Sequence, residues 1–138
     1  MKSTLAKGLS TTKRFTVDRD RTISFMGEEM RVYATPSMVR DVEHTCLDFL
    51  KQHLDEGENS VGARVEIDHL GPTLLDMPVD VTATIADIDG RRVTFEVEVK
   101  DAIETVGKAK HVRFVVDLAR QKSRLEQKRD KVKGLAKA

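Results

Sequence analysis

Three side chains suited to acid–base or nucleophilic chemistry lie in or beside strongly patterned segments of the chain: Thr35, Glu43 and His69. Glu43 belongs to the stretch VYATPSMVRDVEHTCLDFL, residues 32–50, whose apolar periodicity predicts one amphipathic helix. On a helical wheel that starts at Val39, Glu43 falls at about 40°, within the apolar arc. Burying an ionised carboxylate without partners is costly, so this position requires an explanation.

Two explanations of Glu43 are open. A structural one is that the side chain bends to the helix edge or pairs with a buried base. A functional one is that the carboxylate lies in a cleft, ready for acid–base or nucleophilic work. His69 closes the inward-facing series of a predicted strand, where a histidine is either a satisfied core residue or a partner for Glu43. The presence of Glu43 and His69 on the inward faces of one small domain favours the functional explanation.

The predicted helix has a clear start and stop. Thr35 is expected to be the N-cap and Pro36 to occupy the first helical position, where its missing N–H is harmless. The Thr35 hydroxyl keeps the capacity for a second contact, because it has one donor and two acceptor sites. Gly57 is the expected stop.

The pattern changes to period two after the helix, which predicts four antiparallel strands. The inward-facing residues are expected to be Val61, Ala63, Val65, Ile67 and His69, then Val79, Val81, Ala83 and Ile85, then Val93, Phe95, Val97 and Val99, with a last strand near residues 105–116. Asp89-Gly90 predicts a hairpin turn. One helix followed by a meander of long strands is an α+β plan in which the sheet wraps round the helix.

The chain is expected to fold as one domain with two extensions. Residues 1–12 are an expected flexible arm, and residues 13–118 form the folded domain, with a weak first strand within residues 13–25. Residues 119–138 form a basic tail, expected to be helical, in which Leu118, Leu125 and Val132 recur every seven residues. This tail is either a solvated helix or a contact for an acyl carrier or a nucleotide phosphate.

Composition narrows the class of protein. The 24 basic and 23 acidic residues nearly cancel, so the net charge favours neither nucleic acid nor a membrane as a partner. Cys46 is the single cysteine, which fits a reducing compartment, and no apolar run is long enough for a signal peptide or a membrane span. A cytoplasmic protein without a metal or other cofactor is therefore expected.

The residues also resemble a known family, the hot-dog fold thioesterases of the fluoroacetyl-CoA thioesterase type. The resemblance runs from about residue 14 to residue 118. It rests on VYAT, on the helix Glu eight residues later in VEHTCLDFL, on GENSVGARVEIDH, and on VGKAKHVRFVVDL.

The resemblance implies hydrolysis of a small or medium acyl-CoA by a homodimer, or by a tetramer of paired dimers, with active sites at the subunit interface. The catalytic trio of the family falls on Thr35, Glu43 and His69, its glycine near the thioester on Gly62, and its late-strand arginine on Arg113. By analogy, Glu43 attacks the thioester carbonyl or activates water, Thr35 positions it and His69 handles protons. Backbone N–H groups near Gly62 or the helix start hold the oxyanion.

One departure from the family concerns the segment before Thr35. This segment is shorter here, and Glu29 stands where the family has a lid phenylalanine, so the resemblance carries the reaction class and not fluoroacetyl selectivity. The alternatives are a non-catalytic hot-dog module that binds acyl-CoA or a small ligand, and a hot-dog dehydratase or hydratase, which the helix Glu and Thr fit less well.

Overall fold

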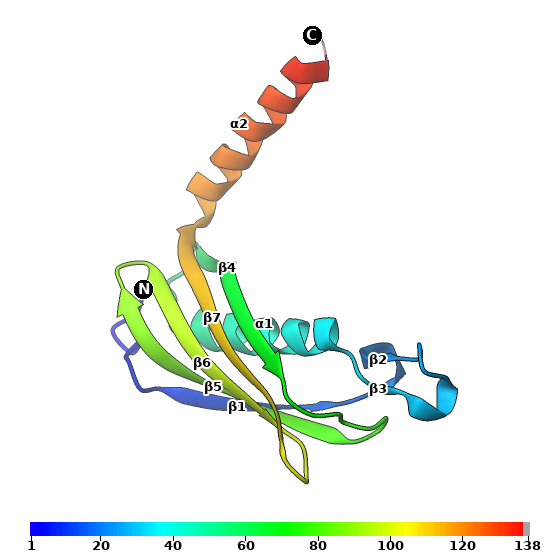
Figure 1. The fold of residues 1–138 in the computed structure, drawn as a ribbon. Coiled ribbons are helices and arrows are strands. Elements are labelled where there is room, and N and C mark those ends of the chain that lie inside the picture. The colour runs from blue at the N-terminus through cyan, green and yellow to red at the C-terminus, as the bar shows by residue number, and fades with distance from the viewer. Residues whose placement is uncertain (137–138) are drawn as a thin grey trace.

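One antiparallel sheet of five strands forms the body of the protein (Figure 1). The computed structural model describes residues 1–136. The strands are β1 (Ser10–Thr16), β4 (Glu58–His69), β5 (Pro78–Asp89), β6 (Arg92–Lys100) and β7 (Thr105–Asp117), in the spatial order β1-β5-β6-β7-β4. The α+β plan predicted from the sequence is confirmed. Strand β4 lies at one edge of the sheet.

Helix α1 (Thr35–Lys51) lies across the inner face of this sheet. Its buried apolar side chains are Met38, Val42, Cys46, Phe49 and Leu50. They meet the inward residues of β5 and β6, and these are the ones that the alternation predicted: Val79, Val81, Ala83, Ile85, Val93, Phe95, Val97 and Val99. Each large apolar side chain buried in this way contributes about 1.5–3 kcal/mol relative to exposure.

The inward face of β4 differs from the prediction in its first half. A β-bulge between Gly62 and Arg64 adds one residue to β4 and reverses the phase of its side chains. Gly62 therefore faces inward opposite Arg113, and Val61 faces outward opposite Phe114. Only the second half of the strand, which includes Ile67 and His69, keeps the predicted phase.

The segment between β1 and α1 contains short elements: two single-turn 3-10 helices, η1 (Arg19–Arg21) and η2 (Glu28–Met30), and a two-stranded sheet of β2 (Thr22–Ile23) and β3 (Val32–Tyr33). The predicted first strand within residues 13–25 is thus divided between β1 and β2. The expected arm is shorter than residues 1–12, because β1 begins at Ser10. The amino group of Met1 is also held, by Asp55 at 2.7 Å and by Glu58.

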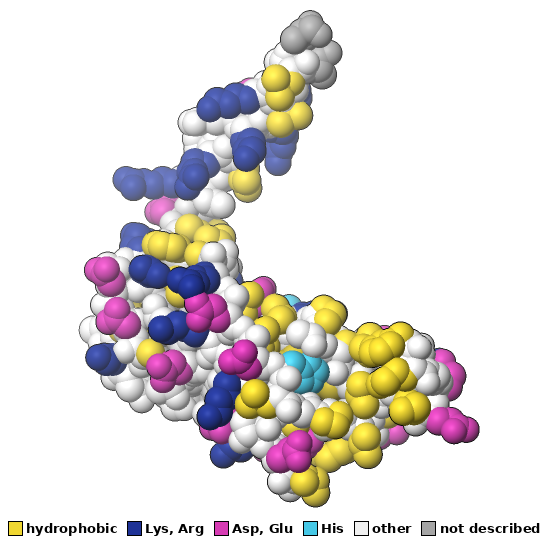
Figure 2. All heavy atoms as spheres, in the orientation of Figure 1, with side chains coloured by type: hydrophobic (Ala, Val, Ile, Leu, Met, Phe, Trp, Pro, Cys, Tyr) yellow, Lys and Arg dark blue, Asp and Glu magenta, His cyan; other side chains and the backbone are white. Residues whose placement is uncertain are grey.

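Helix α2 (Leu118–Ala136) projects from the end of β7 away from the sheet (Figure 1). It starts beside Gly57, whose carbonyl accepts a hydrogen bond from the Leu118 N–H. Its heptad residues Leu118, Leu125 and Val132 are about half exposed, and basic side chains follow its length (Figure 2). The last two residues of the predicted tail, 137–138, lie outside the described residues.

Gly107 provides a test of how closely α1 approaches the sheet. A Cβ atom at this position of β7 would lie 2.5 Å from the Met38 sulfur. We expect Gly107→Ala to lower the free energy of unfolding by about 1–3 kcal/mol, because Met38 is fully buried and has to repack. Urea unfolding measures this change.

Gly134→Ala is the matched control for Gly107→Ala. No atom lies within 4 Å of the added Cβ atom on the exposed α2 helix. There the same exchange raises helix propensity, so its effect is stabilising and at most about 1 kcal/mol. Equal effects of the two substitutions would contradict the packing argument.

Candidate functional site

Thr35 and His69 form the centre of the candidate site. Thr35 Oγ1 lies 2.7 Å from His69 Nδ1, across the gap between the start of α1 and the end of β4. The N-cap of α1 is Ala34 and not Thr35, and it makes no side-chain capping bond. Thr35 is therefore the first helical residue. Its hydroxyl hydrogen-bonds to His69 and does not cap the helix. This corrects the predicted capping role.

The surroundings of His69 favour a neutral imidazole. The ring is half-buried, and its burial lowers the pKa of His69 below 6.5, against a smaller opposite effect of the Gly71 backbone. The edge of the Tyr33 ring packs against it, with ring centroids 6.2 Å apart and planes at 74°. A neutral imidazole can accept a proton from a hydroxyl or water, which is the chemistry of a general base.

Glu43 lies at the border of the buried face of α1. Its side chain is half-exposed, whereas the buried face is centred on Met38, Val42, Phe49 and Cys46. The helical wheel was centred too far toward Val39, which is itself only half-buried, and this error placed Glu43 inside the apolar arc. The carboxylate is thus accessible from the open side of α1, next to edge strand β4.

Arg113 is buried beneath β4 opposite Gly62. Its guanidinium donates to the Ser60 hydroxyl at 2.8 Å, to the Ser60 carbonyl at 3.1 Å and to His111 Nε2 at 3.1 Å. Burial lowers the pKa of Arg113, and the nearby Cys46 and Glu43 oppose this shift. The Glu43 carboxylate therefore faces a desolvated positive charge.

His111 has its tautomer fixed by its two partners. The guanidinium of Arg113 can only donate, so His111 Nε2 accepts, and Nδ1 donates to the Arg64 carbonyl at 2.7 Å. Burial lowers the pKa of His111, as does the charge of Arg113. Gly62 leaves room for this pair, because a Cβ atom there would lie 3.4 Å from Arg113 Nη1 and 3.5 Å from His111 Cε1.

The five predicted site residues fall into two groups within one protomer. Thr35 and His69 meet at one end of α1. Glu43, Gly62 and Arg113 lie together further along, since eight residues of helix separate Thr35 from Glu43 by about 12 Å. Among the described residues, no hydrogen bond joins Glu43 to Thr35 or His69, so one protomer does not assemble all five.

An apolar surface lies beside the Thr35–His69 pair. Figure 2 shows hydrophobic side chains gathered over the end of the molecule that carries β2 and β3, with a histidine next to them. Its exposed members are Ile23, Phe25, Met26, Met30, Leu70 and Leu74. Phe25 is 77% exposed, which is unusual for so large an apolar side chain in a folded protein.

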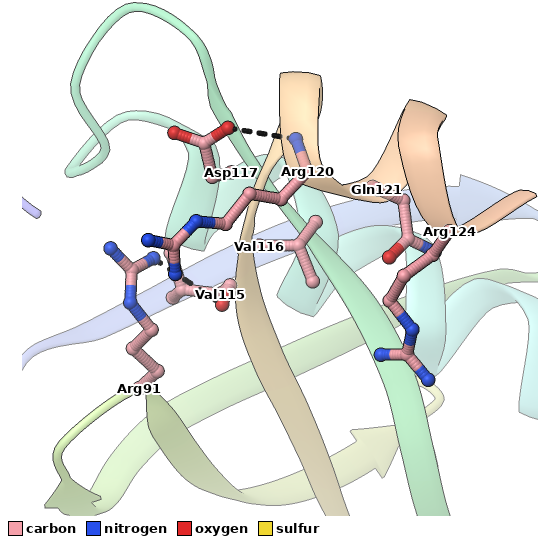
Figure 3. Close-up of a pocket in the computed structure, with 7 residues that line it drawn as sticks. All are labelled: Arg91, Val115, Val116, Asp117, Arg120, Gln121 and Arg124. Carbon is pink, nitrogen blue, oxygen red and sulfur yellow. Dashed lines mark hydrogen bonds between the residues drawn. The ribbon is translucent and has the colours of Figure 1, made fainter.

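A separate groove of about 450 Å³ lies at the base of α2 (Figure 3). It is lined by Arg91, Val115, Val116, Asp117, Arg120, Gln121 and Arg124. Arg91 extends from the β5–β6 turn toward Arg120, while Asp117 accepts a hydrogen bond from the Arg120 backbone N–H at 3.0 Å. None of the five predicted site residues lines this groove, so its basic character is unrelated to the Thr35–His69 pair.

Two buried polar residues were missed by the sequence analysis. Asp41 was not singled out, yet its side chain is 3% exposed. His111 was not singled out, although it shares the inward phase of β7 with Ala109 and Val115, which was the available signal.

Cys46 is no candidate nucleophile, because burial raises the pKa of its thiol to about 12.

Within residues 1–136, no three His, Cys, Asp or Glu side chains gather as a metal site would require. No helix in this part of the chain is both long and apolar enough to cross a membrane.

One helix wrapped by an antiparallel sheet is the hot-dog fold. A hot-dog-like protein from Thermanaerovibrio acidaminovorans has the same fold, with a TM-score of 0.82 at 23% identity over 88% of this chain and 91% of that one. The fold alone does not assign an activity.

The chain belongs to the fluoroacetyl-CoA-specific thioesterase family, whose model matches residues 17–119. It is 28% identical to the fluoroacetyl-CoA thioesterase of Streptantibioticus cattleyicolor, over 93% of this chain and 97% of that protein. It also resembles the solved structure of a variant fluoroacetyl-CoA-specific thioesterase in complex with fluoroacetate and CoA. That match has a TM-score of 0.76 and 28% identity, over 84% of this chain and 98% of that one.

The two histidines with lowered pKa make the free energy of unfolding depend on pH. Well above pH 6.5 they are neutral in both the folded and the unfolded protein. Below pH 6.5 the unfolded chain binds protons that the folded protein does not, so the free energy of unfolding decreases as the pH is lowered. Urea unfolding between pH 7.5 and 5 measures this slope.

Variants assign the slope to the two histidines. His111→Gln keeps an acceptor for Arg113 and a donor for Arg64, and we expect it to remove part of the slope. His69→Gln removes another part, and the double variant removes both. An unchanged slope in the double variant would contradict the assignment.

Proposed function

We propose that this protein hydrolyses acyl-CoA thioesters, with Thr35, Glu43 and His69 as its catalytic residues. The observation that carries the proposal is the 2.7 Å contact between Thr35 Oγ1 and His69 Nδ1 in a member of a thioesterase family. A hydroxyl paired with a neutral imidazole is a common arrangement for proton transfer in acyl-transfer sites. An accessible carboxylate, Glu43, supplies the second functional group.

In the proposed reaction the C–S bond of the thioester breaks and water adds to the carbonyl carbon. Glu43 either attacks the carbonyl and forms an acyl-enzyme anhydride, which water then hydrolyses, or activates the water directly. The neutral His69 accepts the proton released from the water and delivers it to the CoA sulfur, and Thr35 holds the imidazole in place. Arg113 acts on Glu43 through its charge, since each of its three nitrogen atoms already donates to Ser60 or His111.

We propose further that the active protein is a homodimer paired through edge strand β4. The strand is twelve residues long, and its outer edge has no partner strand within the described residues. Val61 and Val65 on it are 38% and 36% exposed. A long exposed edge with apolar side chains is normally covered by another strand.

Antiparallel pairing of two β4 edges supports a site shared between subunits. It brings His69, at the end of one strand, beside the first half of the other strand, where Ser60 and Gly62 lie. Glu43 of the partner subunit faces that half. The two groups of residues that one protomer keeps apart are joined in this way, and the Gly62 backbone is placed near the thioester.

The proposed substrate carries a small or medium acyl group. The apolar surface of Phe25, Met26 and Met30 next to His69 supports an acyl group with hydrocarbon character. Glu29, in place of a lid phenylalanine, gives no support for fluoroacetyl selectivity. The single buried Cys46 is consistent with a reducing, cytoplasmic location.

Substitution of the two catalytic groups tests the reaction. We expect Glu43→Gln and His69→Asn each to lower kcat by about 10²–10⁴, the usual contribution of acid–base groups. Release of CoA thiol from a panel of acyl-CoA substrates is the measurement, with circular dichroism as the check on folding. Glu56→Gln is the matched control, because Glu56 is an exposed acid beyond α1. Turnover unaffected by Glu43→Gln and His69→Asn would contradict the assignment.

Mixing inactive subunits tests whether the site is shared. Chains carrying Glu43→Gln and His69→Asn are each inactive as homodimers. Their heterodimer contains one site with both native groups if Glu43 and His69 come from different subunits. Equal mixing and subunit exchange then restore about a quarter of wild-type activity, because half the dimers are mixed and each has one intact site. No recovery in verified heterodimers would contradict the shared site.

A further inference from the structure

Asp41 is the carboxylate that α1 buries most completely, and neither its burial nor its partners are explained by the proposed reaction. Tyr33 Oη donates to Asp41 Oδ2 at 2.5 Å. Arg21 donates to the same carboxylate through Nε at 2.9 Å and Nη2 at 3.2 Å. The carboxylate thus holds a neutral hydroxyl and a two-point ion pair at once, which is a geometrically specific arrangement.

The partners of Asp41 bracket one segment of the chain. Arg21 precedes residues 22–32 and Tyr33 follows them, so a single carboxylate ties both ends of this eleven-residue segment to α1. A backbone hydrogen bond from the Ala34 N–H to the Arg21 carbonyl, 2.8 Å long, closes the same loop. The segment carries Phe25, Met26 and Met30 of the apolar surface.

Tyr33 connects this carboxylate to the candidate site. Its hydroxyl is fixed by Asp41 on one side, and its ring packs in a T-shaped arrangement against the His69 ring on the other. The tyrosine is 1% exposed, so it has little freedom to move independently of these two neighbours. The orientation of His69 toward Thr35 is therefore coupled to the position of the Tyr33 ring.

We propose that Tyr33 and Asp41 are positioning residues, which hold the His69 ring in line with Thr35 and fix the ends of segment 22–32 beside it. The inference rests on the proposed role of His69 in thioester hydrolysis. Asp41 acts through Tyr33, and Arg21 holds the Asp41 carboxylate through two further hydrogen bonds. Neither Tyr33 nor Asp41 takes part in proton transfer to the substrate.

Two variants of Tyr33 separate its ring from its hydroxyl. Tyr33→Phe retains the ring and removes the bond to Asp41, whereas Tyr33→Leu removes both. We expect kcat to fall by roughly tenfold in Tyr33→Phe and further in Tyr33→Leu, with KM changed much less, because misplacement of a reacting group slows the chemical step. Partial rescue by Phe relative to Leu identifies the ring as the element that touches His69.

A double-variant comparison distinguishes positioning from general support of the fold. If Tyr33 acts through His69, Tyr33→Leu lowers the residual kcat much less in a His69→Asn background than in the wild type. The same factor in both backgrounds would overturn the proposal. Tyr33→Phe keeps the comparison usable if Tyr33→Leu does not fold.

A measurement on the resting protein separates this inference from the proposed function. The ring resonances of His69, assigned in NMR spectra by their loss in His69→Asn, are expected to shift and broaden in Tyr33→Phe and in Asp41→Asn. Unchanged His69 resonances in both variants would overturn the positioning role, whether or not a thioester is hydrolysed. Shifted resonances without turnover on any acyl-CoA would leave the positioning role intact and refute the reaction.

Discussion

The structure depends on one constraint: within the described residues, α1 is the only helix that covers the inner face of a five-stranded sheet. A helix about 10 Å wide cannot cover five strands spaced about 4.8 Å apart, so part of the inner face remains open. The open part lies over β4, where Val65 is partly exposed and Glu43 is half-exposed. The accessible chemistry therefore lies where the core is incomplete, and the same gap leaves the edge strand available for a second subunit.

The buried polar groups follow from the same constraint. Arg113, His111 and Ser60 lie under the half-covered strand, where a large apolar core cannot be completed by one protomer. They satisfy one another, and every buried side-chain nitrogen and oxygen atom among the described residues has a hydrogen-bond partner. The guanidinium of Arg113 is therefore desolvated without a hydrogen bond to a carboxylate, which is unfavourable.

Much of the fold could be predicted from the sequence because strands β5 and β6 alternate strictly. The inward orientation of Val81 and Phe95 can be predicted from the alternation in each strand alone, without reference to neighbouring strands. Strand β4 was predicted only in its second half, because a bulge has no signature in alternation read from one strand. Glu43 was placed too deep because the wheel was centred on Val39.

Asp41 shows why the rest of the candidate site could not be predicted. Nothing in the helix itself distinguishes it from Asp48, which is exposed. The difference is Arg21, twenty residues earlier, whose guanidinium reaches Asp41 only after the chain has folded back through β2 and β3. Contacts of this kind depend on tertiary geometry. The residue types of Thr35 and His69 could be recognised, but their 2.7 Å contact could not.

The projecting helix α2 changes the meaning of the near-neutral net charge. Residues 1–117 carry 16 basic and 21 acidic side chains, whereas residues 118–138 carry eight basic and two acidic ones. A body of charge −5 therefore carries an arm of charge +6, and the total of +1 conceals a strong electric dipole. Such a molecule orients in the field of its neighbours, and attraction between the arm of one particle and the body of another is screened by salt. Its colloidal behaviour is thus governed by ionic strength far more than its isoelectric point suggests.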